Sequence, residues 1–192
     1  MSDRVKIREV RILSKRWGEL REYVFEFLRR DGTTQVLGRE VYDRGDSAAV
    51  LILCRSRQTV ILTRQIRMPI LAGGHDGGLV IEVPAGLVEN RTPEDAVRRE
   101  VTQETGVSIG SLTKVLEVFP NPSVITERVH LFIAECEPEA RRFPGGGLAS
   151  EGEDIEVLEF STAEVMEMIE CGKIKDSKTI ILFLFATTHG LV

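Results

Sequence analysis

Residues 86–107 read GLVENRTPEDAVRREVTQETGV, and the stretch contains both ends of a helix. Thr92 is a residue type that caps helix N-termini, and Pro93 suits the first helical position. Gly106 is typical of a helix end. These signals predict a helix from Pro93 to Thr105.

Two carboxylates lie on one face of this predicted helix. Glu100 and Glu104 are four residues apart, so they project from the same side, and at about 100° per residue they fall within the apolar arc of Ala96, Val97 and Val101. Like charges in an apolar stripe are unfavourable without compensation, which a divalent cation such as magnesium or manganese would supply. The alternative is a solvated pair on a polar face.

The order of predicted elements indicates an α/β fold. The segment Glu82–Leu87 is an apolar strand end that runs into a glycine just before the helix, an arrangement suited to a diphosphate–metal site. Further helices are expected after a Ser161–Glu164 capping box and from about Lys178 to Thr188. The expected strands are 5–13, 20–29, 33–41, 47–54, 59–64, 79–83, 112–119 and 129–136. We predict a small N-terminal antiparallel sheet in residues 1–45, followed by an α/β/α sandwich with a mixed sheet in residues 46–192.

Composition excludes several function classes. A net charge of −5 and a pI near 5.4 argue against a basic surface for nucleic acid. The run Ile180–Ala186 is too short to span a membrane, and the N-terminus resembles no signal peptide. Cys54, Cys136 and Cys171 lack metal-site spacing, so we expect buried thiols in a cytoplasmic protein.

The helix segment resembles the signature of the Nudix hydrolases. Thr92 stands where that signature has Glu, Gln103 replaces the first residue of its Glu-Glu pair, and the spacing from Gly86 to Arg99 is one residue short. The matching positions are Gly86, Arg99, Glu100, Val101, Glu104, Gly106 and Val107.

The resemblance extends along the chain to the ADP-ribose pyrophosphatase-like branch, and within it the chain is most similar to GDP-mannose pyrophosphatases. The matching segments are 39–45, 64–67, 124–127, 153–159 and 176–179. This resemblance implies Mg²⁺-dependent hydrolysis of a nucleoside diphosphate sugar, with GDP-mannose giving GMP and mannose 1-phosphate. Two alternatives stay open: an ADP-ribose pyrophosphatase giving AMP and ribose 5-phosphate, and a non-catalytic nucleotide-sugar sensor.

The resemblance also implies residue roles at the metal site. Metal ligands would be Glu100, Glu104, Glu153 and the carbonyl of Ala85. Glu151 matches the residue proposed as general base, although a solvated loop acid is the alternative for it.

Substrate-binding residues are implied on both predicted parts of the chain. Arg67 would contact the diphosphate, and Lys178 the sugar side. Trp17 would stack on the base, or simply pack. The full implied set is Trp17, Arg39, Glu40, Arg67, Gly86, Leu87, Glu127 and Lys178. A homodimer held by the N-terminal sheet would carry Arg39 and Glu40 toward the partner's site.

Overall fold

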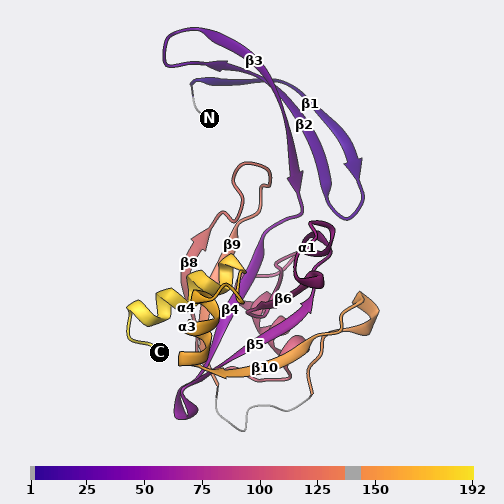
Figure 1. The fold of residues 1–192 in the computed structure, drawn as a ribbon. Coiled ribbons are helices and arrows are strands. Elements are labelled where there is room, and N and C mark those ends of the chain that lie inside the picture. Colours follow the sequence, from indigo (N-terminus) through magenta and orange to yellow (C-terminus); the bar gives the residue numbers. More distant parts are fainter. Residues whose placement is uncertain (1–2, 137–143) are drawn as a thin grey trace. The chain divides into compact units, whose positions relative to one another are not determined.

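A computed structural model describes residues 3–136 and 144–192 and divides the chain into two compact units. The first unit comprises the chain up to Asp46 together with Phe119–Arg128, and the second comprises Ser47–Val118 and the chain from Val129 onward (Figure 1). The sequence places a boundary after residue 45. It does not predict that Phe119–Arg128 belongs with the N-terminal strands.

The first unit is a three-stranded antiparallel sheet in the order β1-β2-β3. Its strands are β1 (Val5–Lys15), β2 (Glu19–Leu28) and β3 (Thr34–Asp43). The segment from Phe119 joins the end of β3 through main-chain bonds, since the Tyr42 N–H donates to the Val124 carbonyl at 2.9 Å and the Thr126 N–H to the Tyr42 carbonyl at 3.1 Å. Asp46 accepts hydrogen bonds from Arg128, which fastens the same segment at its other end.

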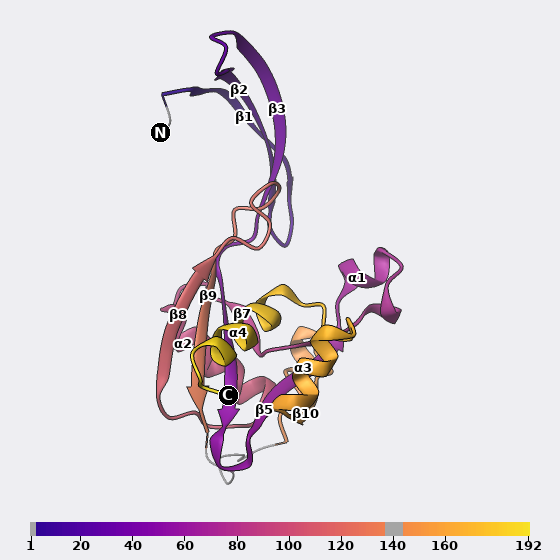
Figure 2. The same ribbon diagram turned by 60° about the vertical axis from the view of Figure 1, so that its left-hand side comes forward.

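The second unit is built on a seven-stranded mixed sheet. The strand path is β10-β5-β4-β9-β8, with β6 added to β5 and β7 added to β4. Among the strands that the structure describes in this sheet, only β4 and β9 pair in parallel, and Figure 2 shows β8 and β9 side by side. The bounds are β4 (Ser47–Cys54), β5 (Thr59–Ile66), β6 (Leu79–Glu82), β7 (Ala85–Leu87), β8 (Leu112–Val118), β9 (Val129–Glu135) and β10 (Glu156–Ser161).

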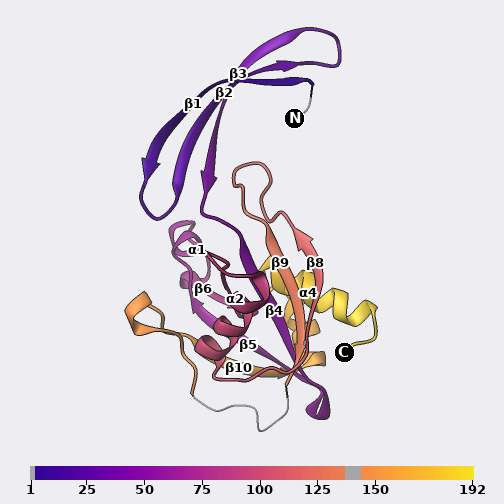
Figure 3. The same cartoon turned by 180° about the vertical axis from the view of Figure 1, so that it is seen from behind.

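Helices cover both faces of this sheet, which confirms the predicted α/β/α sandwich. Helices α3 (Thr162–Glu170) and α4 (Ser177–Thr188) lie on one face, in front of the sheet in Figure 1. Helix α2 (Pro93–Glu100) lies on the opposite face, which Figure 3 turns toward the reader. Because β4 runs through the middle of the sheet, alternate residues such as Leu51 and Ile52 enter different apolar clusters, and both are fully buried.

The predicted helix after residue 92 forms, with a change of winding. Thr92 is the N-cap, and its side chain accepts a hydrogen bond from the Asp95 N–H at 3.1 Å. The α-helix ends at Glu100 and continues as one π-helical turn, Val101–Thr105, which Gly106 ends in the left-handed conformation at φ 71°.

Three elements, α1 (Met68–Ala72), β7 and β10, were not predicted from the sequence. Helix α1 and strand β7 span five and three residues, too short for a periodic pattern. Strand β10 pairs with β5 at the edge of the sheet, and its partly exposed residues give only a weak apolar signal. The capping box of Ser161 and Glu164 and the last helix are as predicted.

Candidate functional site

Glu100 and Glu104 flank the change from α-helical to π-helical winding. Both residues are buried, at 7% and 1% exposure. Single π-helical turns are rare, and they occur often at functional sites because they re-aim side chains that regular winding would place elsewhere. The carboxylate pair that the sequence predicted is therefore inside the fold, which excludes the alternative of a solvated polar face.

The Glu104 carboxylate has a polar atom without a partner. Among the described residues, nothing donates a hydrogen bond to its buried Oε2. Burial raises the pKa of Glu104 well above its usual range, and the charges of Glu82 and Glu100 raise it further, against an opposing effect from Arg67. A buried acceptor left unpaired costs free energy, so this oxygen is suited to a bound cation.

Glu100 is held more firmly. Its Oε1 accepts two hydrogen bonds from the guanidinium of Arg99, at 2.9 and 3.1 Å. Burial raises the pKa of Glu100, while Arg99 counteracts that effect. Gly86 on β7 lies directly against this side chain, and a Cβ at Gly86 would come within 2.4 Å of Glu100 Cδ. Glycine is therefore required there to admit the carboxylate.

Glu82, at the end of β6, is the carboxylate that the sequence analysis failed to assign to the site. It is 2% exposed, and its Oε1 accepts a hydrogen bond from Arg67 Nε at 2.7 Å while its Oε2 is paired with Lys178 Nζ. Burial alone would lower the pKa of Lys178, but Glu82 and Asp176 outweigh it, so the pKa is raised and the ammonium stays charged. In the sequence, the sign that Glu82 belongs to the site was its position at the end of an apolar strand, four residues before Gly86.

Glu82 and its partners Arg67 and Lys178 are connected to the start of helix α4 by hydrogen bonds. Asp176 caps that helix, accepting hydrogen bonds from the Thr179 N–H at 3.0 Å and the Thr179 hydroxyl at 2.6 Å. It also accepts from Lys178 Nζ at 2.9 Å. The Thr179 hydroxyl in turn accepts from the Val83 N–H at 2.8 Å. This network ties the strand that carries Glu82 to the start of the last helix.

A loop that begins with the glycines at 145–147 packs on the end of the helix that carries Glu104. The Gly146 N–H donates to the Glu104 carbonyl at 2.8 Å, and the Gly147 N–H donates to the Gln103 carbonyl at 3.0 Å. Carbonyls at the end of a helix accept no hydrogen bond from within the helix, and here the loop provides the donors. Glu153 is fixed in the same loop.

Glu153 and Glu151 stand at different depths. The Glu153 Oε2 accepts a hydrogen bond from the Leu148 N–H at 2.8 Å, and its charge acts on both Glu100 and Glu104. Glu151 is exposed, and its charge acts on Glu100 and Arg99. The structure thus brings all four predicted acids into one electrostatic neighbourhood, together with Glu82.

The donor set suits a hard divalent cation. The carboxylates supply oxygen ligands, and the unpaired Glu104 Oε2 is an acceptor that such an ion would satisfy. Within residues 3–136 and 144–192, no group of three His, Cys, Asp or Glu side chains is already close enough to hold a metal ion. Binding would therefore draw carboxylates together around the ion.

The predicted substrate residues are divided between the two units. In the second unit, Ala85, Gly86 and Leu87 form β7, while Arg67 and Lys178 are both ion-paired with Glu82. In the first unit, Trp17 is 78% exposed with the Arg44 guanidinium 4.2 Å above its ring. Arg39 and Glu40 lie on exposed positions of β3, and Glu127 is partly buried on the mostly exposed segment that joins β3.

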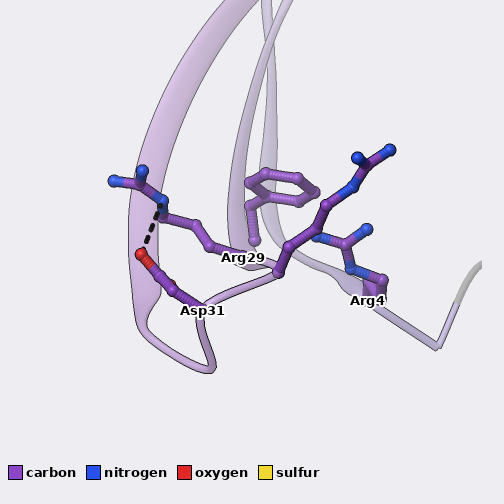
Figure 4. Close-up of a pocket in the computed structure, with 5 residues that line it drawn as sticks. Arg4, Arg29 and Asp31 are labelled. Atoms are coloured by element: carbon purple, nitrogen blue, oxygen red, sulfur yellow. Dashed lines mark ion pairs between the residues drawn. The ribbon is translucent and has the colours of Figure 1, made fainter.

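A cavity of about 440 Å³ lies in the first unit, at the turn that links β2 to β3. Figure 4 shows the Arg29–Asp31 ion pair and Arg4 around it, and the Arg4 guanidinium lies 5.1 Å above the Phe27 ring. None of the predicted site residues lines this cavity. The candidate functional site is therefore the group of carboxylates in the second unit, not this cavity.

Comparison with known proteins assigns both parts of the chain. Residues 4–42 match the family model described as GDP-mannose pyrophosphatase NudK N-terminal domain, and residues 43–183 match the NUDIX domain. No helix in the part of the chain that the structure describes is long and apolar enough to cross a membrane.

Similar sequences extend over the full length. A protein of Pectobacterium atrosepticum named GDP-mannose pyrophosphatase is 42% identical, with 99% of this chain and 97% of that protein covered. Proteins with the same name from Klebsiella pneumoniae and Escherichia coli are 41% and 38% identical, covering 96% and 100% of the relatives. A crystal structure of an ADP compounds hydrolase has the same fold at TM-score 0.75, 16% identity and coverage of 99% and 98%.

Proposed function

The chain belongs to the Nudix family of hydrolases, and from that premise we propose that it cleaves the pyrophosphate bond of GDP-mannose, giving GMP and mannose 1-phosphate. One observation carries the chemistry: the buried, unpartnered Glu104 Oε2 among further carboxylates, which is the acceptor a divalent cation needs. Nudix hydrolases use a divalent metal, and we propose Mg²⁺ here. The choice of GDP-mannose is supported by the relatives of that name at 38–42% identity.

The metal ligands in this proposal are Glu100, Glu104, Glu153 and the carbonyl of Ala85. Glu104 is the deepest of the carboxylates, and Gly86 leaves the room that the Glu100 side chain occupies. Glu153 belongs to a loop fastened to the Glu104 main chain, so it can approach the same ion. A bound cation would neutralise charge at the diphosphate and would activate water.

Glu151 is the proposed general base. It is exposed on the loop that carries Glu153, so it can reach solvent water and accept its proton. Arg67 is the proposed diphosphate contact, since a guanidinium offers several donors and only the Nε of Arg67 is used by Glu82. Its pairing with Glu82 orients the remaining donors.

The N-terminal unit is proposed to complete the substrate site and to hold a homodimer. Its sheet exposes large apolar side chains that would be covered in a dimer: Ile7, Val10, Ile12, Leu13 and Val36. Trp17, Arg39, Glu40 and Glu127 of this unit, with Leu87 and Lys178 of the second, are the proposed contacts to base and sugar. We propose that the dimer works in the cytoplasm.

A panel of nucleoside diphosphate sugars tests the activity. We expect Mg²⁺-dependent turnover with the highest kcat/KM for GDP-mannose, and loss of turnover in EDTA. If ADP-ribose is cleaved with a much higher kcat/KM, the ADP-ribose alternative replaces this proposal. If GDP-mannose binds in the presence of Mg²⁺ but no substrate is cleaved, the chain is a sensor.

Sedimentation of the full chain tests the dimer. We expect a dimer at micromolar concentration, and a charge placed at one of these exposed apolar positions, Ile12→Lys, should shift it toward monomer. The exposed β2–β3 turn offers the matched control Arg30→Glu, which should leave the mass unchanged. A fully active monomeric wild-type protein would remove the proposed dimer.

A further inference from the structure

Two cysteines face each other across the parallel strands β4 and β9. Cys54 is the last residue of β4, and Cys136 follows the last residue of β9. The strands pair up to Leu53 and Glu135, so the two cysteines occupy the next position of the register. The Cys136 N–H donates to the Leu53 carbonyl at 3.0 Å, which holds the pair in this register.

The two thiols are in contact. Their Sγ atoms are 2.8 Å apart, and the residues are 0% and 8% exposed. Neighbouring strands lie about 4.7–4.9 Å apart, within the Cα separation of roughly 4.4–6.8 Å that a disulfide spans. Both side chains belong to the apolar cluster on the α2 face of the sheet, so they point to the same side.

A guanidinium lies beside the pair. Arg57, in the exposed turn after β4, places its Nη2 3.6 Å from Cys54 Sγ while pairing with Glu159 of β10. The hydrogen bond between the two thiols and the charge of Arg57 lower the pKa of Cys54, the thiol that the guanidinium contacts. Cys54 is therefore the thiol suited to act as the nucleophile.

Neither the carboxylate site nor the proposed hydrolysis uses these residues. We propose that Cys54 and Cys136 form a redox-active pair that hydrogen peroxide converts into an intramolecular disulfide, linking the end of β4 to the end of β9. The Cys54 thiolate attacks one peroxide oxygen, the O–O bond breaks, and hydroxide leaves as Cys54 becomes a sulfenic acid. Cys136 sulfur then attacks Cys54 sulfur, forming the S–S bond as the S–O bond breaks. In sum, two thiols lose two electrons, and peroxide takes up their two protons to give two waters.

The crosslink joins positions 82 residues apart in the chain. A disulfide across so long a segment restricts the unfolded chain, and the contact distance means that little movement is needed to form it. Oxidation should therefore raise the melting temperature by about 5 °C or more. A thiol reductant should reverse the change.

Peptide mapping of the folded wild-type protein tests the proposal. The protein is treated with hydrogen peroxide, unfolded in a thiol-alkylating reagent and digested. We expect a peptide pair linked through Cys54 and Cys136, its loss on reduction, and a higher melting temperature of the oxidised form at every protein concentration. The exposed Cys171 supplies an internal control: Cys171→Ser should give the same linked pair, and Cys136→Ser should give none.

Two results would overturn the redox pair. In the first, Cys54 and Cys136 both stay alkylatable after peroxide has already oxidised Cys171. In the second, the only disulfides found join two chains through Cys171. Both results come from mapping the wild-type protein, so they stand even if Cys136→Ser folds poorly.

Discussion

Glu82 and Glu104 are two buried carboxylates of the same unit that the fold treats in opposite ways. Each is at most 2% exposed, and the charge of Glu82 acts directly on Glu104. Glu82 is paired with Arg67 and Lys178. Glu104 has an oxygen for which no described residue is a donor.

A buried carboxylate can position other side chains, as Glu82 does, or remain available for a ligand, as Glu104 does. The pairing of Glu82 offsets the cost of its burial within the protein, so this residue can position Arg67 and Lys178 without any ligand. The burial of Glu104 is not offset in this way, because three further acids, Glu82, Glu100 and Glu153, act on it against Arg67 alone. Its ionised form therefore depends on a bound cation. Replacing each by glutamine should therefore produce opposite combinations of stability and activity.

The largest effect is expected for Glu104→Gln. This change keeps the shape of the side chain and removes the charge, so we expect kcat to fall roughly 10³-fold or more, because charge stabilisation at a metal is worth several kcal/mol. The fold should persist, and the metal-free melting temperature should be equal or higher. Turnover of GDP-mannose and a thermal melt measure the two effects.

Glu94→Gln is the matched control for Glu104→Gln. Glu94 is an exposed acid in the first turn of the same helix, and both the turnover and the melting temperature of this variant should stay close to wild type. Near wild-type turnover of Glu104→Gln would mean that the unpaired carboxylate is only a structural feature.

The acids of the loop sharpen the comparison, because one is held by main chain and the other is exposed. Glu153→Gln removes a proposed ligand, so higher Mg²⁺ should partly restore its kcat by mass action. Glu151→Gln removes a proposed proton acceptor, which should cost on the order of 10²-fold or more and flatten the acid limb of the pH profile. The measurement is kcat against pH and Mg²⁺ for both variants. Rescue of Glu151→Gln by metal would move the base elsewhere, with Glu127 tested next.

Glu82→Gln should act mainly on stability. It leaves Lys178 buried with one carboxylate partner instead of two, and breaking a buried pair costs about 3–5 kcal/mol. Arg67 is 40% exposed, so solvent screens part of the loss, and we expect about 3 kcal/mol, or a melting temperature roughly 6–12 °C lower.

A double variant tests whether the pair is the cause. Glu82→Gln with Lys178→Met removes both charges, so it should be less destabilised than the sum of the two single changes. Additive losses in thermal melts would show that Glu82 and Lys178 stabilise the unit independently.

The comparison also shows what a sequence can reveal about this site. Glu100 and Glu104 were predicted because a helix repeats every few residues, and their burial follows from the apolar residues around them. Glu82 was missed because its partners lie 15 and 96 residues away in the chain, where no local pattern connects them. The π-helical turn was missed for a related reason: its end bonds to a loop beyond residue 143, and no local pattern connects the two.

The fold was predicted more completely than the site. Strands and helices leave a periodic apolar signal, and the capping residues Thr92 and Ser161 mark helix starts locally. Cys171 was expected to be buried and is exposed, because it follows helix α3 at its solvent end. Such a position depends on how the helix ends, which the sequence leaves open.

The last expected effect is the part of the pH dependence of stability that the Glu104→Gln variant lacks, since the pKa of Glu100 is raised as well. The pKa of Glu104 is raised in the folded state, so the folded protein keeps a proton that the unfolded chain releases above about pH 4.5. Stability is therefore fully present below that pH and falls as pH rises toward the folded pKa, by at most about 1.4 kcal/mol per pH unit. In EDTA, the melting temperature of wild type should fall from pH 5 to pH 8 relative to Glu104→Gln.

Magnesium should remove this difference, which ties the pH effect to the unpaired carboxylate. A cation that binds the ionised Glu104 stabilises only the folded state, so Mg²⁺ should raise the wild-type melting temperature most at pH 8 and least at pH 5. Glu104→Gln should respond weakly at either pH, whereas Glu94→Gln should respond like wild type. Parallel melting curves for wild type and Glu104→Gln across this range, with or without Mg²⁺, would mean that Glu104 is no more strained than Glu82, and the contrast between the two carboxylates would be lost.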